Sequence, residues 1–173
     1  MTTSPISPTS AVPAAGRTAG PYHYEDFEPG RLFAHHWGRT LTEADAVLFA
    51  TQTHQYQPAL FNAAYAAHLG HRDRPVSELL TFSVVLGLSV ADLTESGGPF
   101  LGADEMSFGV PVYVGDTLDA TSVVVSRRES GSRPGWGVVR WRTVGTNQHG
   151  DMVVHYQRSS LVRRRPEETG ADT

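Results

Sequence analysis

The sequence contains no cysteine in 173 residues. This absence excludes a disulfide framework, a catalytic thiol and thiolate ligands for a metal ion. It also contains no apolar run of about 18 residues, so no transmembrane helix is predicted. Together with the missing disulfides, this favours a cytoplasmic protein.

Positive charge is not in excess either. The formal net charge is −4 and the isoelectric point is near 6.0. A weakly acidic chain has no long-range attraction to polyanions, so neither nucleic acid nor a membrane surface is expected as a partner.

The two ends lack the apolar residues that a folded core requires. Residues 1–20 are rich in Ser, Thr, Pro, Ala and Gly, and residues 166–173 are polar and charged. Such compositions cannot offset the entropy cost of ordering, so both ends are predicted to be disordered tails. The N-terminal tail also lacks the basic start and apolar middle of a secretory signal. Residues 21–165 are predicted to form one domain.

Helical signals come first within this domain. The segment after Thr42 has acidic residues in its first turn and apolar residues at helical spacing, with Thr42 as the expected N-cap. An Ala-rich helix is predicted to end near Gly70. A third segment, residues 78–96, is apolar on nearly every face over about five turns, which is typical of a helix buried on most sides.

Strand signals follow, enriched in β-branched and aromatic residues and separated by turn sequences. We expect strands near residues 31–38, 100–113, 117–128, 136–146 and 152–163. Helices followed by an antiparallel meander favour an α+β fold. The predicted architecture is the hotdog fold, a five-stranded antiparallel sheet wrapped around a long central helix. A single sheet of this kind leaves one edge unpaired, so a homodimer or a dimer-based assembly is expected.

One stretch, Met106–Leu118, carries a family resemblance. Its pattern of Phe-x-x-Pro-Val followed by Gly-Asp-Thr-Leu resembles the MaoC-like hydratase/dehydratase family. Pro111 suits an edge or bulge position and Gly115-Asp116 suits a tight turn. The resemblance extends over residues 22–164. It implies a hotdog fold and a lyase that hydrates or dehydrates an acyl thioester of coenzyme A or of a carrier protein, without a metal or redox cofactor.

The family's catalytic loop has the form Asp-x-Asn/Gln-Pro-x-His. The matching residues here are 55–60, aligned on Gln57-Pro58. Gln55 stands where the family has its acid, and Leu60 stands where it has its histidine. Because an amide does not titrate usefully and leucine exchanges no proton, the usual acid–base route is not available at these two positions. The resemblance implies that Gln55, Gln57 and Leu60 line the substrate pocket, and a polar loop that satisfies its own backbone is the alternative.

Three neighbouring side chains could transfer a proton instead: Tyr56, His54 and Glu78. The alternatives are a histidine that bonds the last carbonyls of a helix, for His54, and an ordinary first-turn acid, for Glu78. The family also holds the thioester oxygen with backbone N–H groups at the start of the central helix. Here that position belongs to Ser77 and Glu78, with Ser77 as the expected N-cap.

No metal site is expected. His68 and His71 lie three residues apart on a predicted helix, but no third ligand accompanies them. His35 and His36 are predicted to point to opposite faces of a strand, so they could not share an ion.

The leading hypothesis is an acyl-thioester hydratase/dehydratase, or a derived reaction, with a non-standard loop. The alternative is a non-catalytic MaoC-like subunit that binds an acyl chain or supports a catalytic partner. A thioesterase is a third hypothesis, which rests on fold analogy alone. A catalytic role requires a proton-exchanging side chain beside the helix N-terminus, whereas a binding role requires only an apolar tunnel.

Overall fold

A computed structural model describes residues 21–166 of the chain. The predicted tails, residues 1–20 and 166–173, therefore lie outside the described residues except for Pro166, and their disorder stays a prediction. In the described part, no helix is long and apolar enough to cross a membrane. The elements are η1 (Tyr24–Asp26), β1 (Leu32–Ala34), β2 (Arg39–Thr40), α1 (Glu43–Gln52), α2 (Pro58–Phe61), α3 (Ala63–His68), α4 (Glu78–Leu88), α5 (Val90–Leu93), β3 (Phe100–Phe108), β4 (Thr117–Glu129), β5 (Trp136–Thr146) and β6 (Met152–Arg163).

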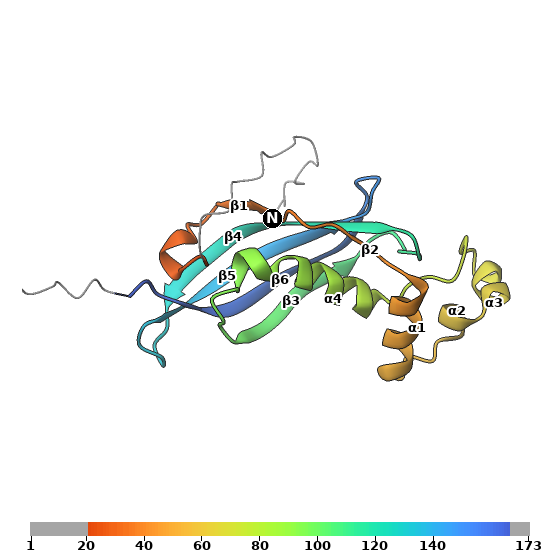
Figure 1. Cartoon of the computed structure of the whole chain (residues 1–173), viewed down its shortest axis with the longest axis horizontal. Coiled ribbons are helices and arrows are strands. Elements are labelled where there is room, and N and C mark those ends of the chain that lie inside the picture. Colours follow the sequence, from red (N-terminus) through yellow and green to blue (C-terminus); the bar gives the residue numbers. More distant parts are fainter. Residues whose placement is uncertain (1–20, 167–173) are drawn as a thin grey trace, which may run out of the picture.

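The strands form one antiparallel sheet in the order β1-β4-β5-β6-β3, and the two-residue β2 also pairs with β4 (Figure 1). β4, β5 and β6 lie within a few residues of their predicted positions. The predicted strand at 31–38 is instead divided into β1 and β2, because regular pairing with β4 stops at Ala34 and resumes only at Arg39. β3 is also shorter than predicted and ends at Phe108.

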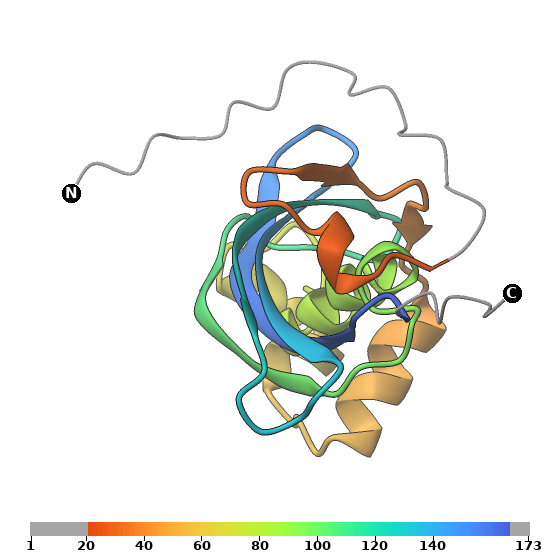
Figure 2. The ribbon, with the colours of Figure 1, turned by 90° about the vertical axis from the view of Figure 1, so that its left-hand side faces the viewer.

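The sheet curls around α4, which lies in its concave face (Figure 2). This arrangement confirms the predicted α+β hotdog fold. The central helix is shorter than the five turns expected, because the chain turns at Ser89 before the short α5. Val85 is fully buried against the sheet, whereas Leu79 and Val90 remain exposed. One sheet covers only one side of an apolar helix, so the prediction of burial on most sides is wrong for the single chain.

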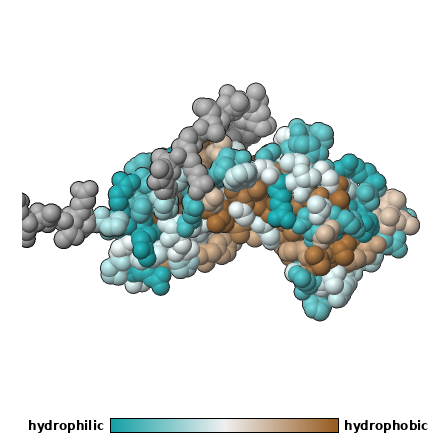
Figure 3. All heavy atoms as spheres, viewed as in Figure 1, coloured by the Kyte–Doolittle hydropathy of each residue, from teal (hydrophilic) through white to brown (hydrophobic). Residues whose placement is uncertain are grey.

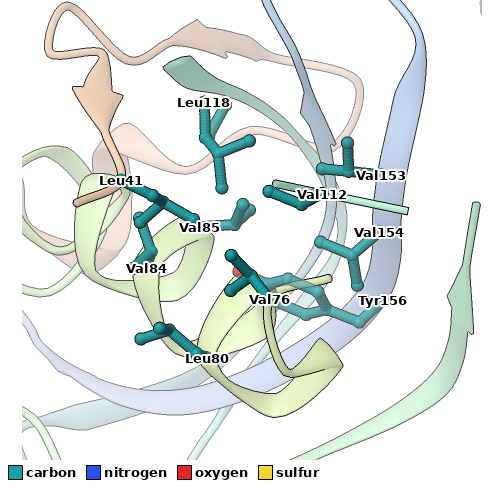
Figure 4. Close-up of a cluster of buried hydrophobic side chains, with 11 residues drawn as sticks. Leu41, Val76, Leu80, Val84, Val85, Val112, Leu118, Val153, Val154 and Tyr156 are labelled. Carbon is teal, nitrogen blue, oxygen red and sulfur yellow. The ribbon is translucent and has the colours of Figure 1, made fainter. Parts of the chain in front are cut away.

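Two apolar clusters hold the helices on the sheet. The larger joins α4 to the strands, with its side chains pointing toward one another (Figure 4). It contains Leu41, Val76, Leu80, Val84, Val85, Val112, Leu118, Ala120, Val153, Val154 and Tyr156. The smaller cluster lies beside α5 and consists of Phe27, Phe33, Leu93, Val124, Val139, Trp141 and Val162.

The predicted cap of the first helix is confirmed. Thr42 is the N-cap of α1 and forms a capping box with Asp45. Asn62 accepts a hydrogen bond from the Tyr65 N–H at the start of α3, which gives this six-residue helix its own cap. These caps position the connection from α1 to α4 across one end of the sheet.

β3 is an edge strand with one side unpaired in the single chain. Its residues and those just after it expose several large apolar side chains: Phe100, Leu101, Met106, Phe108 and Val110. On the face shown in Figure 3, hydrophobic residues gather over α4 and again over the α1–α2 end of the molecule. The apolar surface thus follows the edge of the sheet and the open side of its central helix.

Candidate functional site

A pocket of about 270 Å³ opens at the N-terminus of α4. It lies between the α2–α3 region and the segment that follows β3. Its wall is mostly apolar, with a few polar groups. The lining residues are Gln57, Ala59, Leu60, Leu69, His71, Pro75, Val76, Glu78, Thr81, Phe108, Gly109, Val110, Pro111, Val112 and Val153.

The start of α4 supplies backbone donors to this pocket. The first N–H groups of a helix have no partner within the helix and carry the positive end of its dipole. Val76, just before the helix, donates its N–H to the carbonyl of Val112 at 2.8 Å, which fixes the approach of the chain. The helix start is thus held against the segment after β3, and its free N–H groups are suited to binding a carbonyl oxygen.

Ser77 is the N-cap residue of α4 by position, but its hydroxyl does not cap the helix. It donates instead to Oε1 of Gln55 at 2.5 Å. Gln55, at the position of the family's acid, therefore ties the α1–α2 loop to the start of the central helix. Neither of these two residues is among those that line the pocket.

Gln57 and Leu60, the two other predicted pocket residues of the loop, do line the pocket. Pro58 begins α2, which places Leu60 on the inner side of this short helix, where it is buried. Leu60 therefore contributes an apolar wall where the family motif has its histidine.

The structure does not bring Tyr56 or His54 to the pocket. Tyr56 is 64% exposed, and its hydroxyl lies 3.3 Å from Nδ1 of His54, which is also exposed. His54 has a backbone φ of 57°, a left-handed conformation that turns the chain as it leaves α1. The reversal directs the pair to the outer surface of the single chain. Among the three predicted proton-transfer groups, only Glu78 lines the pocket.

A second titratable side chain in the pocket, His71, was not predicted as a site residue. Gly70, at φ 88°, reverses the chain after α3, and the His71 N–H donates to the carbonyl of Ala66 at 3.0 Å. The Nδ1 atom of His71 lies 3.2 Å from the hydroxyl of Tyr113. In the sequence, the spacing of His71 from His68 indicated only a weak metal pair. The contact with Tyr113 could not be predicted, because Tyr113 is distant in sequence and meets His71 only in the folded chain.

Tyr113 is itself held by the Gly-Asp-Thr-Leu turn. Asp116 accepts hydrogen bonds from the Tyr113 N–H at 2.8 Å, from Arg72 at 3.0 Å and from Gln148 at 2.9 Å. Burial alone would raise the pKa of Asp116, but these donors outweigh it and lower that pKa. The guanidinium of Arg72 also lies over the Tyr113 ring, 4.3 Å from its centroid. The family's turn motif therefore supports one wall of the pocket.

The prediction that His35 and His36 face opposite sides is wrong. β1 ends at Ala34, so strand alternation does not apply to them. Nδ1 of His35 lies 2.7 Å from one oxygen of Asp92, and Nδ1 of His36 lies 3.9 Å from the other. Within residues 21–166, no group of three His, Asp or Glu side chains is arranged to hold a metal ion.

His35 also bonds Ser122, with 2.9 Å between Nε2 and Oγ, so Asp92, His35 and Ser122 are connected in the order of a catalytic triad. Ser122 is 1% exposed and is also bonded to Thr143 at 2.8 Å. A substrate cannot reach this hydroxyl, and the chain of bonds satisfies polar groups that are buried inside the fold.

Comparison with known proteins shows the family to which the chain belongs. The model of the mesaconyl-CoA hydratase family matches residues 9–173. A mesaconyl-CoA hydratase of Haloarcula hispanica is 37% identical over 145 residues, covering 83% of this chain and 40% of the relative. A beta-methylmalyl-CoA dehydratase of Chloroflexus aurantiacus is 34% identical over 142 residues, covering 82% of this chain and 40% of the relative.

Among solved structures, a MaoC domain protein of Chloroflexus aurantiacus superposes with a TM-score of 0.81 at 32% identity. The match covers 91% of this chain and 45% of that chain. The chain therefore spans less than half the length of these relatives. The family model, the relatives and the superposition agree with the hotdog geometry, and the chain belongs to the mesaconyl-CoA hydratase family of MaoC-like hydratases and dehydratases.

Proposed function

We propose that this chain forms an acyl-CoA hydratase/dehydratase site at the N-terminus of α4. The observation that carries the proposal is the pocket in which free helix N–H groups, Glu78 and an apolar wall meet. The relatives that match most of the chain are named as acyl-CoA hydratases or dehydratases, which supports the same reaction here.

In hydration, water adds its oxygen to Cβ of an enoyl thioester and a proton is delivered to Cα. Negative charge develops on the thioester oxygen as the Cβ–O bond forms. The N–H groups at the start of α4 are suited to stabilise that charge, because a helix N-terminus combines free donors with a positive dipole. Glu78 is the proposed proton-transfer group, taking a proton from water or giving one to Cα. Dehydration follows the same steps in reverse.

The proposed substrates are small branched acyl groups on coenzyme A, mesaconyl-CoA in the hydration direction and β-methylmalyl-CoA in the other. A pocket of about 270 Å³ suits a short acyl chain rather than a long one. No metal or redox cofactor is proposed, because water addition to a conjugated thioester needs only proton transfer and charge stabilisation. The cytoplasmic location stays a prediction.

The test is hydration of mesaconyl-CoA, followed by the loss of ultraviolet absorbance from the conjugated thioester. Glu78→Gln should lower kcat by roughly 10²–10⁴-fold, since the amide keeps the shape but cannot exchange the proton. Tyr56→Phe and His54→Ala are the matched controls, and both should stay within about threefold of wild type because their side chains lie outside the pocket. Wild-type activity in the Glu78→Gln variant would contradict the assignment. Hydrolysis of saturated acyl-CoA, measured in parallel, tests the thioesterase alternative.

A second candidate function is a non-catalytic subunit that completes the site of a partner. Two observations favour it. Leu60 occupies the position of the family's histidine, and Gln55, at the position of the family's acid, accepts a hydrogen bond from Ser77. A wild-type chain that binds acyl-CoA but turns over no enoyl-CoA would support this function over the first.

We also propose that two copies of the chain assemble along β3. This strand leaves a row of backbone groups unpaired, and its exposed apolar residues continue onto the open side of α4. Edge strands of this length are normally covered or blocked in soluble folds. Pairing of β3 with a second β3 would satisfy the backbone and cover the apolar surface in one contact.

A further inference from the structure

His71 and Glu78 differ in what they can offer to an acyl group. Both line the pocket. Glu78 is a carboxylate when ionised and accepts hydrogen bonds only, whereas a histidine can donate one and can carry positive charge. Among the described residues that line the pocket, His71 is the one side chain able to become cationic.

The environment of His71 fixes how its ring is presented. Nδ1 lies 3.2 Å from the Tyr113 hydroxyl, and the two rings meet edge to face with centroids 6.2 Å apart. Tyr113 is anchored in turn through its N–H to Asp116. When the Tyr113 hydroxyl donates to Nδ1, the ring proton resides on Nε2, which then becomes a donor. Within residues 21–166, the His71 ring makes no other hydrogen bond.

Two arginines, Arg72 and Arg74, follow His71 closely in sequence, but both are already paired. Arg72 contacts Asp116 at 3.0 Å, and Arg74 contacts Glu43 at 2.5 Å. Neither arginine is among the residues that line the pocket. An anionic group that enters the pocket therefore meets His71 as the one lining side chain that can carry positive charge, with the backbone of α4 and the amide of Gln57 as neutral donors.

We infer that His71 is a specificity residue that binds a free carboxylate on the acyl group of the substrate. This inference rests on the proposed function. A dicarboxylic acyl group on coenzyme A has two oxygen-bearing ends, the thioester and the free carboxylate. The helix N-terminus takes the thioester oxygen, and His71 donates to the carboxylate. Glu78 would repel that carboxylate, so the acyl group is oriented with its free acid toward His71.

The test compares two saturated coenzyme A thioesters that differ only in a terminal carboxylate, succinyl-CoA and butyryl-CoA. Dissociation constants are measured by calorimetry with the whole chain of 173 residues. Wild type should prefer succinyl-CoA by roughly 10–100-fold, the range of a hydrogen bond to a charged group. His71→Leu should abolish that preference while changing the affinity for butyryl-CoA less than about threefold. His71→Gln, which keeps a donor near the place of Nε2, should restore part of it.

His68→Leu is the matched control, because His68 is an exposed histidine at the end of α3 that does not line the pocket. It should keep the full preference for succinyl-CoA, and thermal melting of each variant verifies folding. A preference that survives in His71→Leu would overturn this inference alone, as would an equal loss of affinity for both thioesters. If wild type binds neither thioester, the proposed function fails and this inference fails with it.

Discussion

His35 is a buried histidine whose charge state is coupled to folding. Burial lowers its pKa, and the charges of Arg158 and His36 act in the same direction, while Asp92 opposes them through a hydrogen bond and its charge. The net effect is a pKa below the ordinary value of 6.5. The folded protein therefore holds a neutral imidazole at neutral pH, inside the bonds to Asp92 and Ser122.

The sign of the pH effect follows from this lowered pKa. As pH falls below about 6.5, the unfolded chain binds a proton at His35 before the folded chain does. The contribution of His35 to stability is therefore complete above that pH and declines as the pH falls toward the folded-state pKa. Four carboxyl groups also have lowered pKa values, and they change the stability only in more acidic solution. They are Glu25, Asp26, Asp45 and Asp116.

Urea unfolding at pH 7.5 and 5.5 should thus give a smaller free energy of unfolding at pH 5.5. His35→Gln should reduce this difference, because the amide does not titrate, even though it lowers stability at both pH values. His149→Gln, at an exposed histidine in the β5–β6 turn, should retain the wild-type difference. If all three proteins lose the same free energy between the two pH values, His35 is not the group responsible.

Arg158 is a buried cation that lacks a compensating anion in the described structure. It is 2% exposed, its Nε and Nη2 atoms have no hydrogen-bond partner, and burial lowers its pKa to about 10. Its guanidinium lies over the ring of Trp141, 5.3 Å from the centroid. A cation–π contact of this kind offsets part of the desolvation cost. The positive charge also adds to the effect of burial, which is the main cause of the lowered pKa of His35.

At the scale of elements, the contact between α4 and β5 depends on a glycine. A Cβ at Gly145 would lie 2.6 Å and 3.0 Å from the two methyl groups of Val85 and 3.2 Å from a methyl of Val154. Val85 is a stiff β-branched residue on the inner face of α4, so the helix would have to move away from the sheet.

Gly145→Ala should therefore destabilise the protein by about 1–3 kcal/mol through overpacking. The measurement is chemical unfolding at neutral pH. Gly131→Ala is the matched control, because a Cβ at Gly131 meets nothing within 4 Å and its φ is not in the left-handed region. A wild-type free energy of unfolding for Gly145→Ala would mean that α4 lies farther from β5 than described.

The elements that the sequence predicted well are those set by local signals. Thr42 and Asp45 form the predicted cap, and Gly115, at φ 92°, makes the predicted turn. The end of α4 at Ser89 was not predictable from apolar periodicity, because the apolar pattern continues through α5. The split between β1 and β2 was also missed, since the bonds of His35 to Asp92 and Ser122 form only in the folded chain.

The candidate site was partly predictable for the same reason. Family spacing identified Gln57, Leu60 and Glu78, whose places in the pocket follow from their positions just before α2, on α2 and at the start of α4. Family spacing could not show that Glu78 lines the pocket while His54 and Tyr56 do not, because the direction of these two side chains depends on the left-handed turn at His54. His71 was missed because its partner Tyr113 comes from a distant part of the chain.

At the scale of the whole molecule, the single chain leaves the two edges of its sheet and one face of α4 exposed. The sheet has two edges of different character: β1 is three residues long, whereas β3 has nine residues with exposed Phe100 and Leu101. A short edge offers few backbone groups to a partner, and a long one offers many. The open face of α4 adjoins the β3 side (Figure 3). An assembly through β3 therefore buries more apolar surface than one through β1.

This difference between the edges predicts the outcome of two lysine substitutions. Wild type should have twice the chain mass of 18.8 kDa, or more, by light scattering at micromolar concentration. Leu101→Lys places a charge on the β3 edge and should shift the protein toward the monomer, because the charge would be buried without a partner in the assembly. Leu32→Lys places the same charge on an equally exposed leucine of β1, where it should leave the mass unchanged. Melting curves identify a variant that has lost its fold. A monomeric wild type, or equal dissociation by both lysines, would contradict assembly through β3.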